Sequence, residues 1–256
     1  MKYYEQLLDM GCFSWDELCG TVGNAKTAGS LVRSYLKKGY IQRVKRNLYV
    51  AVNLADRQPV VSKYRIAGRI TPTAYVSHHA AFGYYGCANQ VSYHVEVSSE
   101  TPFATFAFGG YTYRYFASRI KEGIVTRSDG VRVTDTERTV LDGINDFEKN
   151  MGLEELLRCI ELIPSLCGEK LLAYLASYGK QVLYQKTGYI LQHFQKMFNL
   201  DDTFFAACEV EIGESKRYLY RTAMSDEMEY NRRWRLIVPH DLSRITDKGV
   251  PADADA

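Results

Sequence analysis

A run of cationic side chains with no acidic one among them extends from residue 24 to residue 47. Its members are Lys26, Arg33, Lys37, Lys38, Arg43, Lys45 and Arg46. Residues 1–70 hold 12 Lys/Arg against 5 Asp/Glu, a net charge of +7, whereas the whole chain has a net charge of +2, so the other 186 residues carry −5. A cationic block of this kind attracts phosphate groups, and its chemistry is that of nucleic-acid binding.

These cations fall on two predicted elements, a helix and a hairpin. Asn24 is a favourable N-cap and Gly39 a favourable C-terminal stop for the helix between them. Its apolar stripe consists of Ala25, Ala28, Leu31, Val32, Tyr35 and Leu36. The following segment YIQRVKRNLYVAV predicts two strands around a turn at residues 45–47, where Asn47 tolerates a left-handed conformation.

Two shorter helices are predicted before this pair. Tyr3–Met10 has apolar residues at helical spacing and stops at Gly11. Ser14 and Glu17 form a capping box, which begins a second helix that we expect to reach about Cys19. Three helices followed by a cationic hairpin is the order of a winged helix-turn-helix DNA-binding domain, which we place at residues 1–55.

In such a domain the third helix enters the major groove of DNA with its N-terminal residues nearest the bases. The predicted base readers are Asn24, Lys26, Thr27 and Ser30. The predicted phosphate contacts further along the helix are Arg33 and Lys37. The predicted contacts of the hairpin tip are Arg43, Lys45 and Arg46. Winged helices also bind other proteins. An RNA target is less favoured, because the stacking aromatic residues of single-strand binders are missing.

The rest of the chain predicts a larger domain at residues 56–248, which makes the fold class α+β, with a mostly antiparallel sheet and several helices. The expected strands are 93–98, 103–108, 111–116, 123–126 and 131–134, with late strands at 218–221 and 234–238. The expected helices are 60–70, 78–85 capped by Ser77, one beginning at a second capping box in 134–137, then 153–162, 169–178, 181–198 and 201–208. Residues 249–256 predict a flexible tail.

Candidate catalytic and metal-binding residues in this larger domain have simpler explanations. His78 and His79 are adjacent, so on a helix they point about 100° apart and do not face each other, and packing or capping is favoured over metal binding. Carboxylates at Asp135, Glu137 and Asp142 suggest a nuclease cluster, but Glu137 completes the second capping box and Asp142 pairs with Arg138. Cys159 has no nearby His in the sequence to activate it. We expect no catalytic residue, no metal site and no cofactor.

The six cysteines have irregular spacing and form no CxxC motif, which favours reduced thiols over a disulfide framework or a zinc site. The N-terminal residues resemble neither a signal peptide nor a membrane span, so we expect a cytoplasmic protein with no membrane partner.

Two further patterns leave alternatives open. Tyr111, Tyr113 and Tyr115 alternate on one sheet face, where they suit a core or, less favoured, a binding surface. A second cationic cluster near the C-terminus, Arg232, Arg233 and Arg235, is either a solvated strand edge or an additional contact to DNA or a partner.

Eight segments follow one another along nearly the whole chain: LVRSYLKKGYIQRVKRNLYV, AYVSHHAAFGYYG, YHVEVSS, VRVTDTERTVLDGI, LEELLRCIELI, EKLLAYLASYGKQVLYQKTGYILQHF, YLYRT and WRLIVP. Their order resembles the AbiEi family, the antitoxins of AbiE abortive-infection systems, which are type IV toxin–antitoxin systems. Members of the family commonly have Gly in the tight turn where this chain has Asn47.

The resemblance implies an N-terminal winged helix joined to a family-specific antitoxin domain. It also implies a repressor that binds inverted repeats upstream of its own operon, and a nucleotidyltransferase-like toxin whose action the protein counteracts without necessarily forming a stable complex. Two other functions remain open. One is a stand-alone regulator whose second domain senses a small ligand, and the other is a DNA-processing enzyme that uses His78 or the region of Asp135.

Overall fold

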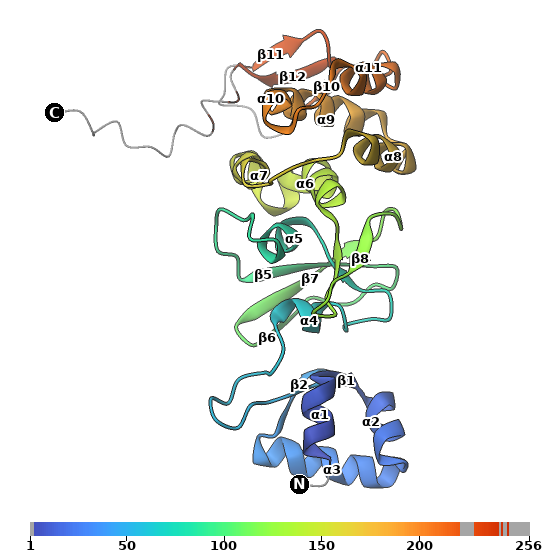
Figure 1. The fold of residues 1–256 in the computed structure, drawn as a ribbon, viewed down its shortest axis with the longest axis vertical. Helices are drawn as coiled ribbons and strands as arrows, with labels where there is room; N and C mark the ends of the chain where they lie inside the picture. Colours follow the sequence, from blue (N-terminus) through green and yellow to red (C-terminus); the bar gives the residue numbers. More distant parts are fainter. Residues whose placement is uncertain (1–2, 221–227, 241, 243–244, 246–256) are drawn as a thin grey trace, which may run out of the picture. The chain divides into compact units, whose positions relative to one another are not determined.

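The computed structural model describes residues 3–220, 228–240, 242 and 245. The chain is a mixed α+β protein with several helices, as its sequence predicts, and its sheets are antiparallel and mixed (Figure 1). It divides into two compact units, each assembled from three stretches of sequence: residues 1–76, 92–118 and 125–133, and residues 77–91, 119–124 and 134–256. The predicted domain boundary near residue 55 stays a prediction, and the predicted tail at 249–256 lies outside the described residues.

The first unit begins with three helices and three short strands. They are α1 (Tyr4–Met10), β1 (Cys12–Ser14), α2 (Trp15–Val22), α3 (Ala25–Lys38), β2 (Ile41–Lys45) and β3 (Leu48–Ala51). The capping box at the start of α2 is confirmed, because the Glu17 amide donates to Ser14 Oγ at 3.2 Å and the Ser14 amide donates to Glu17 Oε2 at 2.8 Å. Gly39 ends α3 in the left-handed conformation, also as predicted. Helix α2 is one turn longer than expected.

The three strands form an antiparallel sheet in the order β1-β3-β2. Strand β1 was not predicted, because three residues between a helix and a cap are too few to show an alternating pattern. The apolar stripe of α3 packs into the core beside this sheet through Ala28, Val32 and Tyr35. Ala25 was assigned to the same stripe but is exposed, since it lies in the first turn, next to the N-cap.

A six-stranded sheet occupies most of the remaining first unit, together with α4 (Lys63–Ala67). Its strands are β4 (Tyr75–Val76), β5 (His94–Ser99), β6 (Phe106–Phe108), β7 (Tyr111–Ala117), β8 (Ile124–Thr126) and β9 (Arg132–Thr134), in the order β6-β7-β5-β4-β9-β8. The sheet is mixed rather than mostly antiparallel. Strand β7 runs parallel to β5 over six residue pairs and β9 runs parallel to β4, because the chain loops through β6 before it pairs with β5.

The second unit is mainly helical. Its elements are α5 (His78–Tyr84), α6 (Thr136–Asn150), α7 (Gly152–Glu161), α8 (Gly168–Tyr178), α9 (Gln181–His193), α10 (Gln195–Phe198), α11 (Asp202–Val210), β10 (Arg217–Tyr218), β11 (Met228–Asn231) and β12 (Leu236–Pro239). The single helix predicted over 181–198 is two helices, and of the predicted strand at 218–221 only Tyr218 is in a strand, while Arg221 lies outside the described residues. No helix in the described parts of the chain has the length and apolar character to cross a membrane.

The second predicted capping box is wrong by one residue. Asp135, not Thr134, caps α6, because its Oδ1 accepts the amide hydrogen of Arg138 at 2.9 Å. Glu137 does not reach back to the cap, and its Oε1 accepts instead from the Cys167 amide at 3.0 Å. Neighbouring Thr and Asp are both good N-caps, so the sequence alone does not choose between them.

Candidate nucleic-acid interface

The polar face of α3 is exposed along its whole length. Lys26, Thr27, Ser30, Arg33 and Lys37 all lie on it, as the sequence predicts. The face is cationic, because it carries Lys26, Arg33 and Lys37 and α3 contains no acidic residue. It offers hydroxyl groups and cations together, which is the chemistry needed to contact base edges and phosphates.

Asn24 has a structural role at the start of this face. Its Oδ1 accepts the Thr27 amide hydrogen at 3.0 Å, and Thr27 Oγ1 lies 3.4 Å from the same oxygen. This confirms Asn24 as the N-cap of α3.

Ser30 connects two of the predicted contact residues. Its hydroxyl donates to the Lys26 carbonyl at 3.2 Å, and Arg33 Nη2 donates to Ser30 Oγ at 3.2 Å. The guanidinium of Arg33 is therefore held over the middle of the exposed face. The guanidinium has four further N–H groups that this hydrogen bond does not use.

The hairpin of β2 and β3 turns through Arg46 and Asn47. Asn47 has a φ of 63°, which confirms the left-handed conformation expected at this position. Its carbonyl accepts the Trp15 amide hydrogen at 3.0 Å, which ties the turn to the start of α2. Arg46 is exposed at the tip, and Arg43 is exposed on β2 with its guanidinium 5.7 Å from the ring centre of Tyr49.

Lys45 does not share the exposure of its neighbours. Its Nζ lies 5.5 Å from the ring centre of Phe103 and 5.9 Å from that of Phe106, and 3.5 Å from the Ile70 carbonyl oxygen. Burial lowers the pKa of this amine. Lys45 therefore packs on aromatic residues of the first unit.

A cationic cleft beside the hairpin was not predicted from the sequence. It has a volume of about 580 Å³, and its charged lining residues are Glu17, Lys45, Arg46, Arg65, Arg69 and Arg132. Arg65 donates to the Asp129 carbonyl and Arg132 to the Pro72 carbonyl, each at 2.7 Å, and Arg69 pairs with Glu17. Arg65 and Arg69 are four residues apart on either side of the end of α4, a spacing that could have revealed part of it.

The C-terminal arginines are partly engaged within the second unit. Arg233 Nε donates to Glu209 Oε1 at 2.6 Å, and Arg235 Nη1 donates to the Gly213 carbonyl at 2.9 Å. Arg232 is exposed. The three arginines lie in the turn between β11 and β12 and not on a strand edge, and two of them are held by contacts within the second unit.

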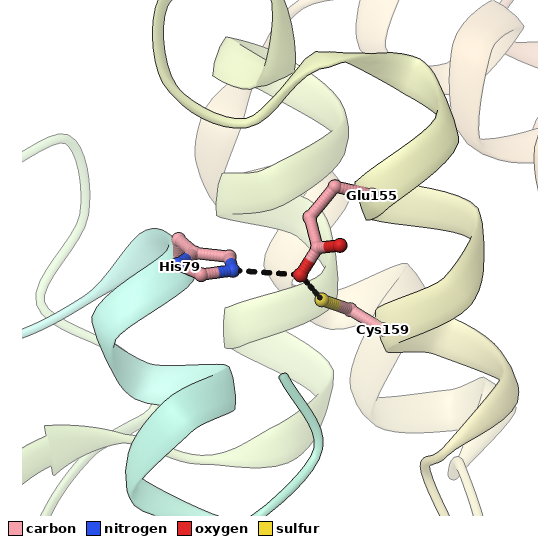
Figure 2. Close-up of side chains that lie close together, drawn as sticks. All are labelled: His79, Glu155 and Cys159. Carbon is pink, nitrogen blue, oxygen red and sulfur yellow. Dashed lines mark hydrogen bonds and ion pairs between the residues drawn. The ribbon is translucent and has the colours of Figure 1, made fainter. Parts of the chain in front are cut away.

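His79, Glu155 and Cys159 meet in the interior of the second unit (Figure 2). Glu155 Oε1 lies 2.9 Å from His79 Nε2 and accepts from Cys159 Sγ at 3.3 Å and from the Gln90 amide at 2.9 Å, while Oε2 accepts from Asn89 Nδ2 at 3.3 Å. The expectation that Cys159 has no nearby His is therefore wrong, because helices α5 and α7 bring distant residues together.

The protonation states at this cluster are set by burial and hydrogen bonding. Burial raises the pKa of Glu155, but the hydrogen bonds from His79 and its other donors outweigh this effect and leave the pKa below its usual value. Burial raises the pKa of Cys159 far above its usual value, so the thiol stays protonated and is a poor nucleophile. The nitrogen, oxygen and sulfur atoms are of the types that bind zinc, but here they already satisfy one another.

Replacing Glu155 with Gln is expected to lower the free energy of unfolding by about 1–3 kcal/mol at pH 7, because an amide cannot accept hydrogen bonds from all four donors. Since the pKa of Glu155 is lower in the folded protein than its unfolded value of 4.5, the difference from wild type should shrink as the pH falls below that value. Urea unfolding at several pH values measures both effects. Glu154→Gln on the exposed side of α7 is the control, and equal stability of both variants would contradict this role.

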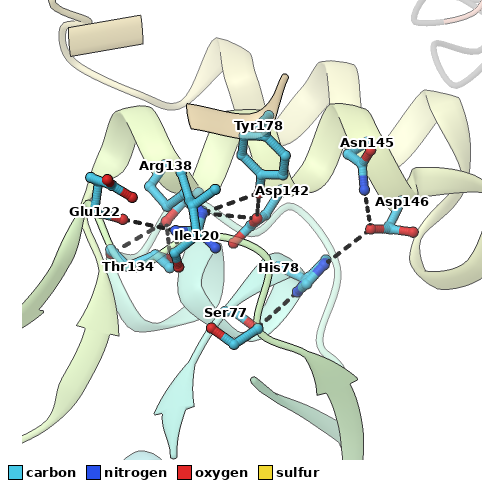
Figure 3. Close-up of polar contacts among 12 residues, drawn as sticks. Ser77, His78, Ile120, Glu122, Thr134, Arg138, Asp142, Asn145, Asp146 and Tyr178 are labelled. Carbon is cyan, nitrogen blue, oxygen red and sulfur yellow. Dashed lines mark hydrogen bonds and ion pairs between the residues drawn. The ribbon is translucent and has the colours of Figure 1, made fainter. Parts of the chain in front are cut away.

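His78 points away from His79, as predicted, and pairs with a different carboxylate. His78 Nε2 lies 3.7 Å from Asp146 Oδ2, and its Nδ1 lies 2.8 Å from Ser77 Oγ (Figure 3). Ser77 is the N-cap residue of α5 but makes no side-chain cap bond. Burial raises the pKa of Asp146, but hydrogen bonds from His78 and Lys149 reverse the shift and hold it well below its usual range.

The three carboxylates of the considered nuclease cluster do not converge on one point. Asp142 Oδ1 accepts from Arg138 Nε at 3.0 Å and from the Tyr178 hydroxyl, which confirms the predicted pair of Arg138 and Asp142. Asp135 and Glu137 instead accept from Lys170 at 3.1 and 3.2 Å. Figure 3 shows the contacts of Arg138 with Asp142 and Tyr178. The ion pairs with Lys170 join the start of α6 to α8.

No protein-family model matches the chain, and no curated protein matches it. The crystal structure of the RV2827C protein from Mycobacterium tuberculosis has a similar fold, with a TM-score of 0.62 over 94% of this chain and 91% of that chain. The two share 11% sequence identity, so the similarity concerns the fold alone.

Proposed function

We propose that α1 to β3 form a winged helix-turn-helix and that the protein binds double-stranded DNA through it. The observation that carries the proposal is the exposed face of α3, which presents Lys26, Arg33 and Lys37 with no acidic residue among them. The order of three helices and a hairpin supports the proposal. Arg43 and Arg46 on the hairpin would contact the backbone on the flank of the major groove.

The cleft beside the hairpin supports the same interface. Its arginines lie in the same compact unit as α3 and the hairpin, and Glu17 is paired with one of them. A DNA backbone that follows the hairpin would find further cations at Arg65 and Arg132. Lys45 has a different role in this proposal, because it anchors the hairpin on Phe103 and Phe106.

We further propose, from the order of sequence segments, that the protein is an AbiEi-type antitoxin in the cytoplasm. In that function it represses its own operon at inverted repeats and counteracts a nucleotidyltransferase-like toxin, with no catalytic step of its own. The neighbouring gene tests this part. Growth arrest on expression of that gene, relieved by this chain, is the expected result, and an unrelated or harmless neighbour would contradict it.

DNA binding is tested by changing Lys26, Arg33, Arg43 and Arg46 to Ala one at a time. Each variant is expected to bind the upstream DNA more weakly in gel-shift titrations. A residue that contacts a phosphate should also reduce the slope of log affinity against log salt by roughly one unit.

The matched control is Lys196→Ala, which removes an exposed lysine of α10 in the second unit. It should leave both the affinity and the salt slope unchanged. Wild-type affinity in all four variants of the interface would contradict the proposed surface, even if the protein still bound DNA.

A further inference from the structure

The second unit contains a large open cavity that the proposed DNA interface does not use. Its volume is about 970 Å³, near the upper end of the range for sites that hold small molecules and cofactors. It is lined by the last part of α6, the start of α9 and the segment of β10. Segments that are distant in the sequence therefore build one concave surface.

Cations outnumber acids on this surface. The charged lining residues are Lys149, Lys180, Lys186, Lys216 and Arg217, against Asp146 and Glu148. Both acids are already paired, because Lys149 donates to Asp146 at 2.6 Å and Lys186 donates to Glu148 at 3.2 Å. The other cations retain their charge for a ligand.

Those other cations are Lys180, Lys216 and Arg217. Within the described parts of the chain none of them forms an ion pair with a carboxylate. Lys180 Nζ donates to the neutral side chain of Asn145 at 3.2 Å. Burial, followed by the nearby charge of Arg119, lowers the pKa of Lys180, which indicates an ammonium group that would gain from an anion.

The wall of the cavity also contains an irregular backbone. Asp146, with φ −128° and ψ 15°, interrupts the helical geometry of α6. It pairs with His78, which has a φ of 53° although it is not a glycine. Residues held in such unfavourable backbone conformations are concentrated at functional sites. The strained residue His78 carries the side chain that pairs with Asp146 at the cavity wall.

An aromatic side chain stands at the same surface. Tyr218 lines the cavity with 58% of its surface exposed, next to Arg217 on β10. In nucleic-acid-binding proteins, bases stack on aromatic rings and cationic side chains bind the phosphates. This surface offers both kinds of group. Arginine additionally offers two parallel hydrogen bonds to a phosphate.

We propose that this cavity binds a nucleotide, with its phosphates at Lys180, Lys216 and Arg217 and its base against Tyr218. The inference is independent of DNA binding, because none of these residues belongs to the first unit. It assigns a ligand to the second unit, where the sequence had left ligand sensing as an alternative.

Titration calorimetry of the full chain with ATP, AMP and inorganic pyrophosphate tests the proposal. We expect saturable binding of ATP with a Kd below about 1 mM and weaker binding of AMP. The double variant Lys180→Gln, Lys216→Gln should weaken ATP binding tenfold or more. Tyr218→Ala should weaken ATP binding but leave pyrophosphate binding unchanged.

Lys196→Gln is the matched control, because this exposed lysine lies in the same unit but outside the cavity. Circular dichroism and unchanged gel-shift affinity would show that the variants remain folded. Absence of saturable ATP binding, or ATP binding equal in wild type and the double variant, would overturn the proposal. Equal binding of ATP and pyrophosphate, unaffected by Tyr218→Ala, would overturn the assignment to a nucleotide.

Discussion

Replacing Gly188 with Ala is expected to destabilise the protein by about 3 kcal/mol, although the same change in a helix usually stabilises. Gly188 lies inside α9 against the indole ring of Trp234, and an added Cβ would overlap three atoms of that ring. The ring cannot easily move. Trp234 is fully buried, its Nε1 donates to Gln192 Oε1 at 2.6 Å and its amide donates to Asn231 Oδ1 at 3.0 Å.

Urea unfolding followed by tryptophan fluorescence measures this effect. Gly20→Ala is the matched control, because Gly20 lies inside α2 with open space around the position of a Cβ. That change should stabilise the first unit by about 0.5–1 kcal/mol. If Gly188→Ala were as stable as wild type, the close packing of α9 on Trp234 would be refuted.

Replacing Arg138 with Met should cost about 3–5 kcal/mol, because it leaves a buried carboxylate without its cation. Arg138 is 1% exposed. Its Nη1 donates to the carbonyls of Ile120 and Glu122 at 3.0 and 2.8 Å, and its Nε donates to Asp142 and to the Tyr178 hydroxyl. The side chain thus joins the short segment 119–124 to α6 and α8.

Urea unfolding of two further variants tests whether the lost stability comes from the unpaired buried charge of Asp142. Arg158→Met removes an arginine from the more exposed pair with Glu154 and should cost no more than about 1 kcal/mol. The double variant Arg138→Met, Asp142→Leu should recover part of the loss, since it also removes the unpaired charge. Equal stability of Arg138→Met and Arg158→Met would contradict the structural role of Arg138.

The features that the sequence predicted correctly depend on neighbouring residues. The cap at Ser14, the cap at Asn24 and the left-handed Asn47 each follow from the local chain. The exposed cationic face of α3 follows from its period of 3.6 residues. These interactions span only a few positions, so their energetic preferences are visible in a single segment.

The features that were missed depend on long-range contacts. Lys45 was expected at the exposed hairpin tip, but its environment is decided by Phe103 and Phe106, almost sixty residues away. Strand β7 was identified, yet its parallel pairing with β5 depends on how the chain returns through β6. Residue type and alternation report burial and side-chain face, but they do not report the direction of a partner strand.

The candidate site was likewise predicted in part. Its helix and hairpin are continuous in sequence, whereas the cleft adds Arg65 and Arg132, which are widely separated. The meeting of His79 with Cys159 has the same explanation. A cluster from several elements carries no spacing rule that a single sequence could reveal.

The threading of the chain affects how the two proposed activities can be separated experimentally. Each compact unit draws on three stretches of sequence, and stretches of one alternate with stretches of the other. A protein shortened after residue 76 would lose β5, β6 and β7 from the first unit together with the whole of the second. Truncation would therefore damage both units at once, so separating the proposed repression from the proposed toxin neutralisation requires point substitutions on an otherwise intact chain.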